Sequence, residues 1–287
     1  KIFCFMLNID LHCHSTVSDG TLTPTQLIER AAIRGVNMLA LTDHDDLDGL
    51  DEARHIASEK NIIFINGVEI SVTWRNRTLH IVGLDVDPKY PPLVQGLEAI
   101  RSGRATRGNK IAEQLDKFGI QGSLEGAYDY VGEGGLIGRT HFARYLVDRG
   151  YAKNVKSVFK KYLVKGKPGY VSHQWALLSD AVGWICGSGG QAVIAHPARY
   201  KLGKNLLDEL LLEFRALGGS GLEIITSSHT PEQTLIFAHH ANRMNLLASC
   251  GSDFHGPDES YFDLGLMPEF PVECIPIWHD WDRKNIV

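Results

Sequence analysis

Short apolar runs alternate with amphipathic stretches at both ends of the chain, and their spacing predicts strands joined by helices. We expect strands at residues 8–12, 38–42, 62–66, 79–84, 192–195, 221–226 and 246–249. The run Thr23-Pro24-Thr25-Gln26 supplies a helix cap, a proline at the first helical position and a capping-box glutamine, and Gly35 ends that helix. Later helices are expected at 206–217 and 231–244. This alternation is typical of parallel strands connected by crossover helices.

The middle of the chain has a different pattern. Between about residues 93 and 167 the spacing indicates helices at 97–118, 140–149 and 155–163 and no convincing strand. We therefore predict an α/β barrel-like body, formed by residues 1–100 and 171–287, that is interrupted by a helical insertion at 101–170.

Charge is distributed unevenly between these parts. From Arg101 to Lys167 there are fourteen basic and six acidic residues, a net +8, whereas the whole chain carries −5 and the remainder therefore −13. A basic module on an acidic body predicts an anionic ligand where the two meet, although a solvated helical face would give the same count.

Composition excludes several classes of protein. A hydrophobic fraction of 44% and a charged fraction of 22% exclude a disordered chain, and the apolar runs are too short to cross a membrane. Five cysteines without a C-x-x-C pair argue against a disulfide scaffold and a cysteine zinc site, and favour a reducing, cytoplasmic location. Because the chain starts at Lys1, we expect either that Met6 is the natural start or that residues precede it.

Metal-ligating residue types gather mainly at the ends of the expected strands. The candidates are His12, His14, Asp19, His44, Glu69, His80, His196, Asp253 and His255. The carboxyl ends of strands in a parallel barrel share one face, so these side chains should meet there. Any one of these histidines alone could be a core or surface residue, and the inference therefore depends on the whole set.

Carboxylates neutralise the repulsion between neighbouring dications, and neutral imidazoles fill the remaining positions without adding charge. This mixture favours Mn, Fe or Zn over Mg or Ca, which prefer oxygen ligands. We predict two or three divalent metals, with Mn preferred.

Seven motifs together resemble the polymerase and histidinol phosphatase (PHP) family of metal-dependent phosphoesterases, over nearly the whole chain. They are His12-x-His14, Ser18-Asp19-Gly20, Thr42-Asp43-His44-Asp45, Gly67-Val68-Glu69, His80-Ile-Val-Gly83, Ala195-His196-Pro197 and Gly251-Ser-Asp253-x-His255. Residues 138–144, 162–171 and 195–200 are similar to the nucleoside-3',5'-bisphosphate phosphatase branch, which also includes enzymes that trim RNA from its 5' end.

The resemblance implies a distorted seven-stranded barrel with a trinuclear metal site and an inserted helical subdomain. One metal would take His12, His14, Glu69 and Asp253; a second would share Glu69 and add His80 and His196; a third would use Asp19, His44 and His255. Arg139 and Arg199 would clamp phosphate, His141 would reach the phosphoryl group, and Arg104 and Lys165 are further candidates for substrate binding.

The implied reaction is hydrolysis of the 3'-phosphate of a nucleoside 3',5'-bisphosphate by a metal-bridging hydroxide, with His44 or His255 assisting the leaving group. Three alternatives stay open: a 5'-3' exoribonuclease acting on 5'-phosphorylated RNA, a phosphatase of another small ester such as histidinol phosphate, and a catalytically silent metal-binding module. We expect a nucleotide or short RNA as the ligand, and neither a membrane nor a protein partner. His229, after an expected strand, is either structural or part of the substrate pocket, and Trp278 and Trp281 of the tail pack either on the barrel or on another subunit.

Overall fold

The computed structural model describes residues 7–132 and 135–281, so Met6 lies outside the described residues. Seven strands form one continuous sheet in the order β1-β2-β3-β4-β6-β7-β8. Their bounds are β1 Ile9–Asp10, β2 Met38–Leu41, β3 Ile63–Trp74, β4 Arg77–Leu84, β6 Gln191–Ile194, β7 Gly221–Ile225 and β8 Leu247–Cys250. A short strand, β5 (Ala176–Leu177), pairs with β3 off this path.

The sheet nearly closes into a barrel because the residues after β1 lie beside those after β8. Leu11 N donates to Cys250 O at 3.1 Å, and Asp253 N donates to His12 O at 2.8 Å. The predicted α/β fold, a seven-stranded barrel with a helical insertion, is thus confirmed.

The expectation of parallel strands throughout is wrong at β4, which runs antiparallel to both β3 and β6. Arg75 and Asn76 make a two-residue turn with φ of 46° and 59°, the left-handed geometry that joins a tight hairpin. Because the turn contains neither glycine nor proline, the sequence pattern did not reveal it, and β3 extends well beyond the expected end at residue 66.

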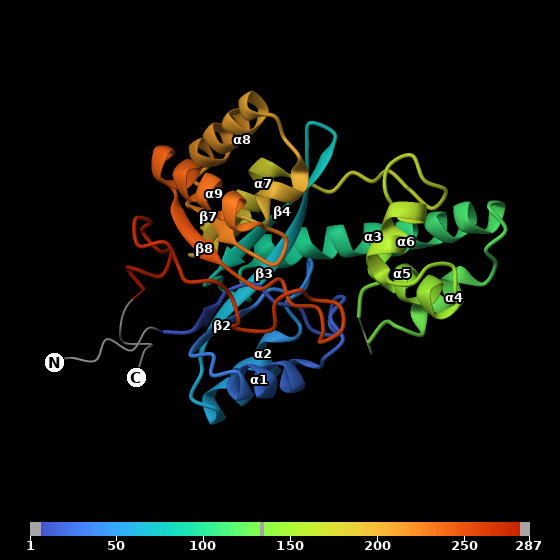
Figure 1. Cartoon of the computed structure of the whole chain (residues 1–287), viewed down its shortest axis with the longest axis horizontal. Coiled ribbons are helices and arrows are strands. Elements are labelled where there is room, and N and C mark those ends of the chain that lie inside the picture. Colours follow the sequence, from blue (N-terminus) through green and yellow to red (C-terminus); the bar gives the residue numbers. More distant parts are fainter. Residues whose placement is uncertain (1–6, 133–134, 282–287) are drawn as a thin grey trace.

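Helices surround the barrel and bury its sheet (Figure 1). They are α1 Pro24–Ile33, α2 Leu50–Glu59, α7 Leu178–Gly187, α8 Lys204–Ala216 and α9 Pro231–Arg243. The pattern analysis located α1, α8 and α9 but neither α2 nor α7. Thr23 and Gln26 form the expected capping box at the start of α1.

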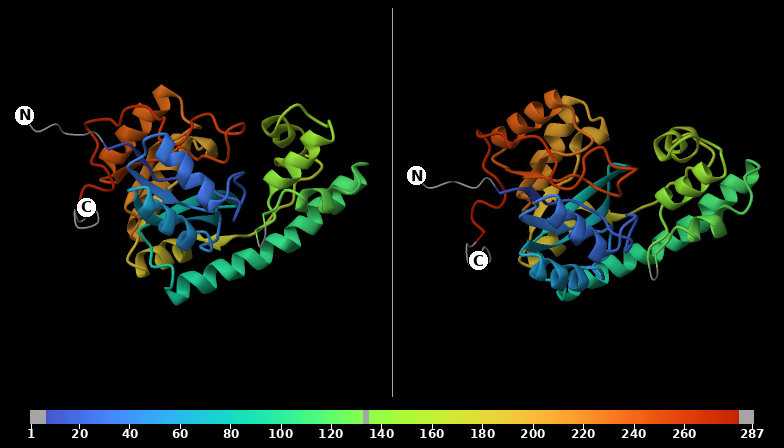
Figure 2. Two further views of the ribbon diagram at one scale, coloured as in Figure 1. Left: turned by 90° about the horizontal axis from the view of Figure 1, so that it is seen from below. Right: turned by 60° about the horizontal axis from the view of Figure 1, so that its bottom comes forward.

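The insertion is a separate lobe reached along one long helix, α3 (Pro91–Lys117), as Figure 2 shows. It contains α4 (Ser123–Tyr128), α5 (Arg139–Asp148), α6 (Val155–Val158) and a π-helical turn, η1 (Phe159–Leu163).

Two cores divide α3 between the lobes. Leu93 and Leu97 pack in the barrel core, whereas Ile111 and Leu115 pack in a core of the insertion. We therefore propose that the insertion begins within α3.

The tail of the chain packs on the barrel. Ile277 N donates to Ala248 O at 2.9 Å beside β8, and Trp278 lies against the barrel core. Across residues 7–132 and 135–281, no helix combines the length and hydropathy of a membrane span.

Candidate metal centre

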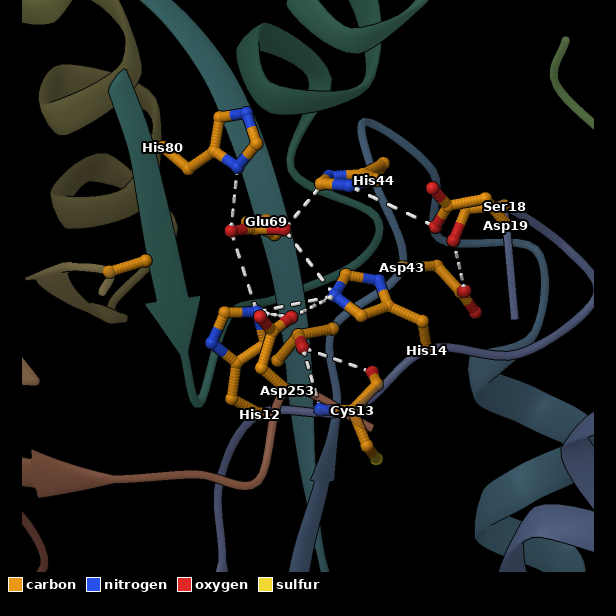
Figure 3. Close-up of polar contacts among 12 residues, drawn as sticks. His12, Cys13, His14, Ser18, Asp19, Asp43, His44, Glu69, His80 and Asp253 are labelled. Atoms are coloured by element: carbon orange, nitrogen blue, oxygen red, sulfur yellow. Dashed lines mark hydrogen bonds and ion pairs between the residues drawn. The ribbon is translucent and has the colours of Figure 1, made fainter. Parts of the chain in front are cut away.

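All nine candidate ligands converge at one end of the barrel, although they come from six segments of the chain. Figure 3 labels all of them except His196 and His255. His12, His14 and Asp19 follow β1, His44 follows β2, Glu69 and His80 lie within β3 and β4, His196 follows β6, and Asp253 and His255 follow β8. His80 reaches this end because β4 is antiparallel, so its first half lies beside the carboxyl ends of the parallel strands.

Glu69 lies at the middle of the cluster and is fully buried. Its Oε1 is 2.9 Å from both His80 Nδ1 and His196 Nε2. Its Oε2 is 2.8 Å from His44 Nδ1. One carboxylate therefore connects histidines from three different elements.

His12 and His14 point their imidazoles at each other, with Nε2 atoms 3.2 Å apart. Asp253 Oδ1 lies 3.5 Å from His12 Nε2 and 3.3 Å from His14 Nε2. Two imidazole nitrogens and a carboxylate oxygen that face one point form a set suited to a shared cation.

Asp19 connects the other side of the cluster. Its Oδ1 is 3.3 Å from His255 Nε2 and 3.8 Å from His44 Nε2. His44 thus lies between Glu69 and Asp19. The ligand atoms form four overlapping groups, each within 4.8 Å, and His44 and His14 each belong to two of them.

The donor set fits divalent metals. Six buried atoms of the cluster make no hydrogen bond among the described residues, because even the short contact between His44 Nδ1 and Glu69 Oε2 lacks the alignment of one. They are His14 Nδ1, Asp19 Oδ1, His44 Nδ1, Glu69 Oε2, His196 Nδ1 and Asp253 Oδ1. Buried polar atoms normally have partners, so unpaired atoms this close together indicate a multi-metal site.

The charges of the cluster support the same conclusion. Burial alone would raise the pKa values of Glu69 and Asp253, but nearby imidazoles, and Arg199 in the case of Asp253, hold both pKa values well below their usual range. Burial lowers the pKa of His14 to about 3. Burial would also lower the pKa of His255, but Asp19 and Asp253 raise that pKa to about 9. Ionised carboxylates beside a neutral imidazole match the needs of a dication.

Two of the candidate ligands have a strained backbone. His196 has φ of 28° and Asp253 has φ of 53°, in a region that residues with side chains rarely adopt. Such conformations persist where the surrounding structure fixes them, and they gather at functional sites.

Glu223 holds the cluster from behind, and our sequence analysis missed it. Its Oε1 lies 2.9 Å from His12 Nδ1, and its Oε2 accepts a hydrogen bond from His196 N at 2.5 Å. By occupying Nδ1 of His12, Glu223 directs Nε2 into the cluster. An acidic residue within the apolar run 221–226 was the available signal.

A cleft of about 540 Å³ opens beside the cluster, between the barrel and the insertion. Asp253, His255 and Arg199 line its barrel side, and Lys156 and Phe159 line its insertion side. Lys156 is a basic residue that the sequence analysis counted but did not single out.

The predicted phosphate-binding residues lie in different surroundings. The Arg199 side chain is 43% exposed, and its guanidinium donates to Asp253 at the cleft. Arg139 lies at the start of α5 with its guanidinium 5.5 Å from the centre of the Phe159 ring. His141 is buried, and its Nδ1 accepts a hydrogen bond from Gly138 N at 2.9 Å. Burial lowers the pKa of His141 to about 4.

Arg104 and Lys165 complete this set. Arg104 donates to Asp45 and, at 3.0 Å, to Ser71 Oγ, and its guanidinium lies 4.9 Å from the centre of the Trp175 ring. Lys165 is exposed in the turn that follows η1.

Comparison with known proteins identifies the family. The PHP domain model matches residues 10–227. The chain is 52% identical to a 3',5'-nucleoside bisphosphate phosphatase of Chromobacterium violaceum over 97% of this chain and 98% of that protein. It is 41% identical to a 5'-3' exoribonuclease of Haemophilus influenzae over 94% of this chain and 97% of that protein.

A solved structure shares the fold as well. A structure of an amidohydrolase from Chromobacterium violaceum, with bound sulfate and no metal, superposes with a TM-score of 0.92 at 52% identity and covers 95% of each chain. The chain belongs to the PHP domain family, and it is a phosphoesterase.

Proposed function

We propose that this enzyme hydrolyses the 3'-phosphate of nucleoside 3',5'-bisphosphates. The observation that carries the proposal is a buried cluster of carboxylates and imidazoles that faces a cleft whose opposite wall is the basic insertion. The name of the Chromobacterium relative supports this choice of substrate.

The nine clustered residues would hold two or three divalent metals, with Mn preferred over Fe or Zn. When bound, such metals lower the pKa of a water molecule and polarise a phosphoryl oxygen. Glu69 would supply ligand oxygens to both sides of the cluster, because its two oxygens face different histidines. His14 and His44 each belong to two of the ligand groups and would likewise contribute to neighbouring positions.

Basic residues at the cleft would bind the phosphates. Arg199 lies beside Asp253 and presents a partly exposed guanidinium, which suits the phosphoryl group under attack. Lys156 lines the insertion side and would hold the second phosphate, together with Arg139, whose guanidinium lies over Phe159 of the same wall, and with His141 of the same helix as Arg139. Of the two histidines expected to assist the leaving group, His255 lines the cleft, which favours it over His44.

The test is phosphate release by the Mn-loaded protein from adenosine 3',5'-bisphosphate, measured beside adenosine 5'-monophosphate and a short 5'-phosphorylated RNA. We expect rapid release from the bisphosphate and at least tenfold slower release from the monophosphate. Equal rates on the two nucleotides would contradict the proposed preference for a bisphosphate. Arg139→Ala should harm the bisphosphate reaction more than the monophosphate reaction, and an equal loss on both would show that Arg139 does not bind the second phosphate.

A second candidate is a 5'-3' exoribonuclease. The cleft shares Val155, Lys156 and Glu259 with another cavity of about 630 Å³, so a longer chain could continue past the insertion. In the same assay, efficient shortening of the RNA with only slow release from the bisphosphate would favour this activity.

A further inference from the structure

A second cavity of about 880 Å³ adjoins the cleft on the side away from the insertion. Ser227, Ser228 and Tyr261 line both spaces, so one surface continues from the cluster into this cavity. The walls are the loop from β7 to α9 and the tail of the chain, two segments to which the proposed reaction gives no role. A ligand with its phosphate at the cluster would extend directly into this space.

The walls are mostly apolar, with a few hydroxyl side chains among them. Leu235, Phe262 and Phe270 supply apolar surface. Ser227, Thr230 and Thr234 add hydroxyl groups to the lining. Apolar walls with a few convergent polar groups are typical of sites for small organic ligands.

The charge of the cavity excludes a phosphate. Within the part of the chain that the structure describes, its lining contains no lysine or arginine, and two glutamates, Glu269 and Glu273, lie on it. His229 adds no charge, because burial lowers its pKa to about 4, and its Nδ1 donates to Ile224 O at 2.9 Å. The basic side chains Lys156 and Arg199 line the cleft instead. The two spaces are therefore suited to different parts of one substrate.

We infer that this cavity binds the nucleobase next to the phosphate under attack. A base has apolar faces that pack on aromatic and aliphatic side chains, and the lining of this cavity supplies both kinds of side chain. Tyr261, 82% exposed at the junction of cavity and cleft, is positioned to cover the base or the sugar. This inference rests on the proposed function, because it needs a substrate that carries both groups.

The experiment compares the Mn-loaded protein on adenosine 3',5'-bisphosphate and on an abasic analogue that keeps the sugar and both phosphates. We expect kcat/KM to be at least tenfold higher with the base. Equal efficiencies on both substrates would overturn the inference while leaving the phosphatase intact, whereas no hydrolysis of either would instead contradict the proposed function. A 5'-phosphorylated RNA with one abasic residue at its 5' end gives the same comparison for a strand.

Substitutions in the cavity test whether the preference for the base arises there. In Tyr261→Ala and Leu235→Asp the ratio of kcat/KM with the base to kcat/KM without it should fall toward one. The first substitution removes an aromatic face, and the second puts a charge on the cavity wall. Leu212→Asp, on α8 and 57% exposed, is a matched control for Leu235, which is 62% exposed, and Tyr128→Ala is the control for Tyr261. An undiminished base preference in both cavity variants would contradict the assignment.

A second copy of the chain could also occupy an apolar cavity of this kind. Analytical sedimentation, which measures the oligomeric state, tests for it. A monomer at assay concentration agrees with an open cavity. A dimer that Leu235→Asp dissociates, together with no base preference, would show that the cavity is a subunit contact and would overturn the inference.

Discussion

Glu223 makes no contact with the cleft, yet it determines which nitrogen of His12 faces the cluster. Partners of this kind fix the tautomer and orientation of a metal-binding imidazole, and their loss weakens metal affinity by about 10- to 100-fold. We therefore predict that Glu223→Gln binds Mn²⁺ about tenfold or more weakly, measured by competition with a chromogenic chelator. Glu213→Gln is the control, because Glu213 also accepts a hydrogen bond, from Trp74, but far from the cluster. Unchanged affinity in Glu223→Gln would contradict this role.

His229 gives a prediction about pH. Burial lowers its pKa to about 4 in the folded protein, whereas the unfolded chain has an ordinary pKa of about 6.5. Between these values the unfolded state binds the extra proton, so this group destabilises the fold as the pH falls from about 6.5 to 4. His229→Gln should lack this loss, which we expect to reach about 3 kcal/mol at pH 4. Urea unfolding of both proteins between pH 7 and 4 measures it, and parallel pH slopes would refute it.

At the scale of single residues, much of the candidate site could be predicted from the sequence. His12, Glu69 and Asp253 stand in short motifs, and the structure brings both carboxylates within 3.5 Å of the His12 imidazole; their role as metal ligands stays a prediction. The supporting residues were harder to find, because the meaning of Glu223 depends on a contact across 211 positions of the chain.

Helix α5 is the element that connects the insertion to the cluster. Thr140 Oγ1 donates to Asp19 Oδ2 at 2.7 Å, and Arg144 donates both to Asp19 O and to the two oxygens of Glu259. These bonds attach the insertion wall of the cleft to the barrel.

Arg144→Met should loosen this attachment. Because a charged hydrogen bond contributes about 2 kcal/mol, we expect amide exchange in 139–148 to speed up by roughly tenfold or more, with a higher KM for the substrate. Arg149→Met, at the exposed end of the same helix, should change neither. Exchange rates that match those of Arg149→Met would show that the attachment lies elsewhere.

The order of most helices and strands could also be predicted from the sequence. The exception was the β3–β4 hairpin, where the direction of β4 was wrong. The spacing of apolar residues and the helix caps depend on residues close together in the sequence. The direction of a strand depends instead on the turn before it and on pairing across the sheet. Arg75 and Asn76 adopt the required left-handed geometry without the usual glycine, so the sequence looked like one more parallel strand. In a parallel barrel the start of the expected strand 79–84 would have put His80 at the end opposite the other ligands. The predicted metal set included His80 all the same, and the antiparallel direction of β4 explains how it reaches the cluster.

At the scale of the whole molecule, the cluster buries several carboxylates at one end of the barrel, and bound metals would neutralise their charge and so stabilise the fold. A ligand at about a thousand times its dissociation constant contributes roughly 4 kcal/mol. We predict that removal of the metals lowers the melting temperature by roughly 8 °C, measured by calorimetry. The difference should shrink at lower pH. Burial alone would lower the pKa values of His12 and His44, but neighbouring carboxylates raise both, so bound metals must displace protons there. A melting temperature independent of metal would contradict a site built into the fold.

The central claim is that this cluster holds at least two metals that act together on a phosphate ester. The most direct test restores Mn²⁺ stepwise to metal-stripped protein and follows phosphate release from adenosine 3',5'-bisphosphate, with bound metal counted in the same samples. We predict little activity up to one equivalent and a steep rise as the second binds, with Glu69→Gln remaining inactive. Full activity in the stripped protein, or saturation at a single equivalent, would contradict the account.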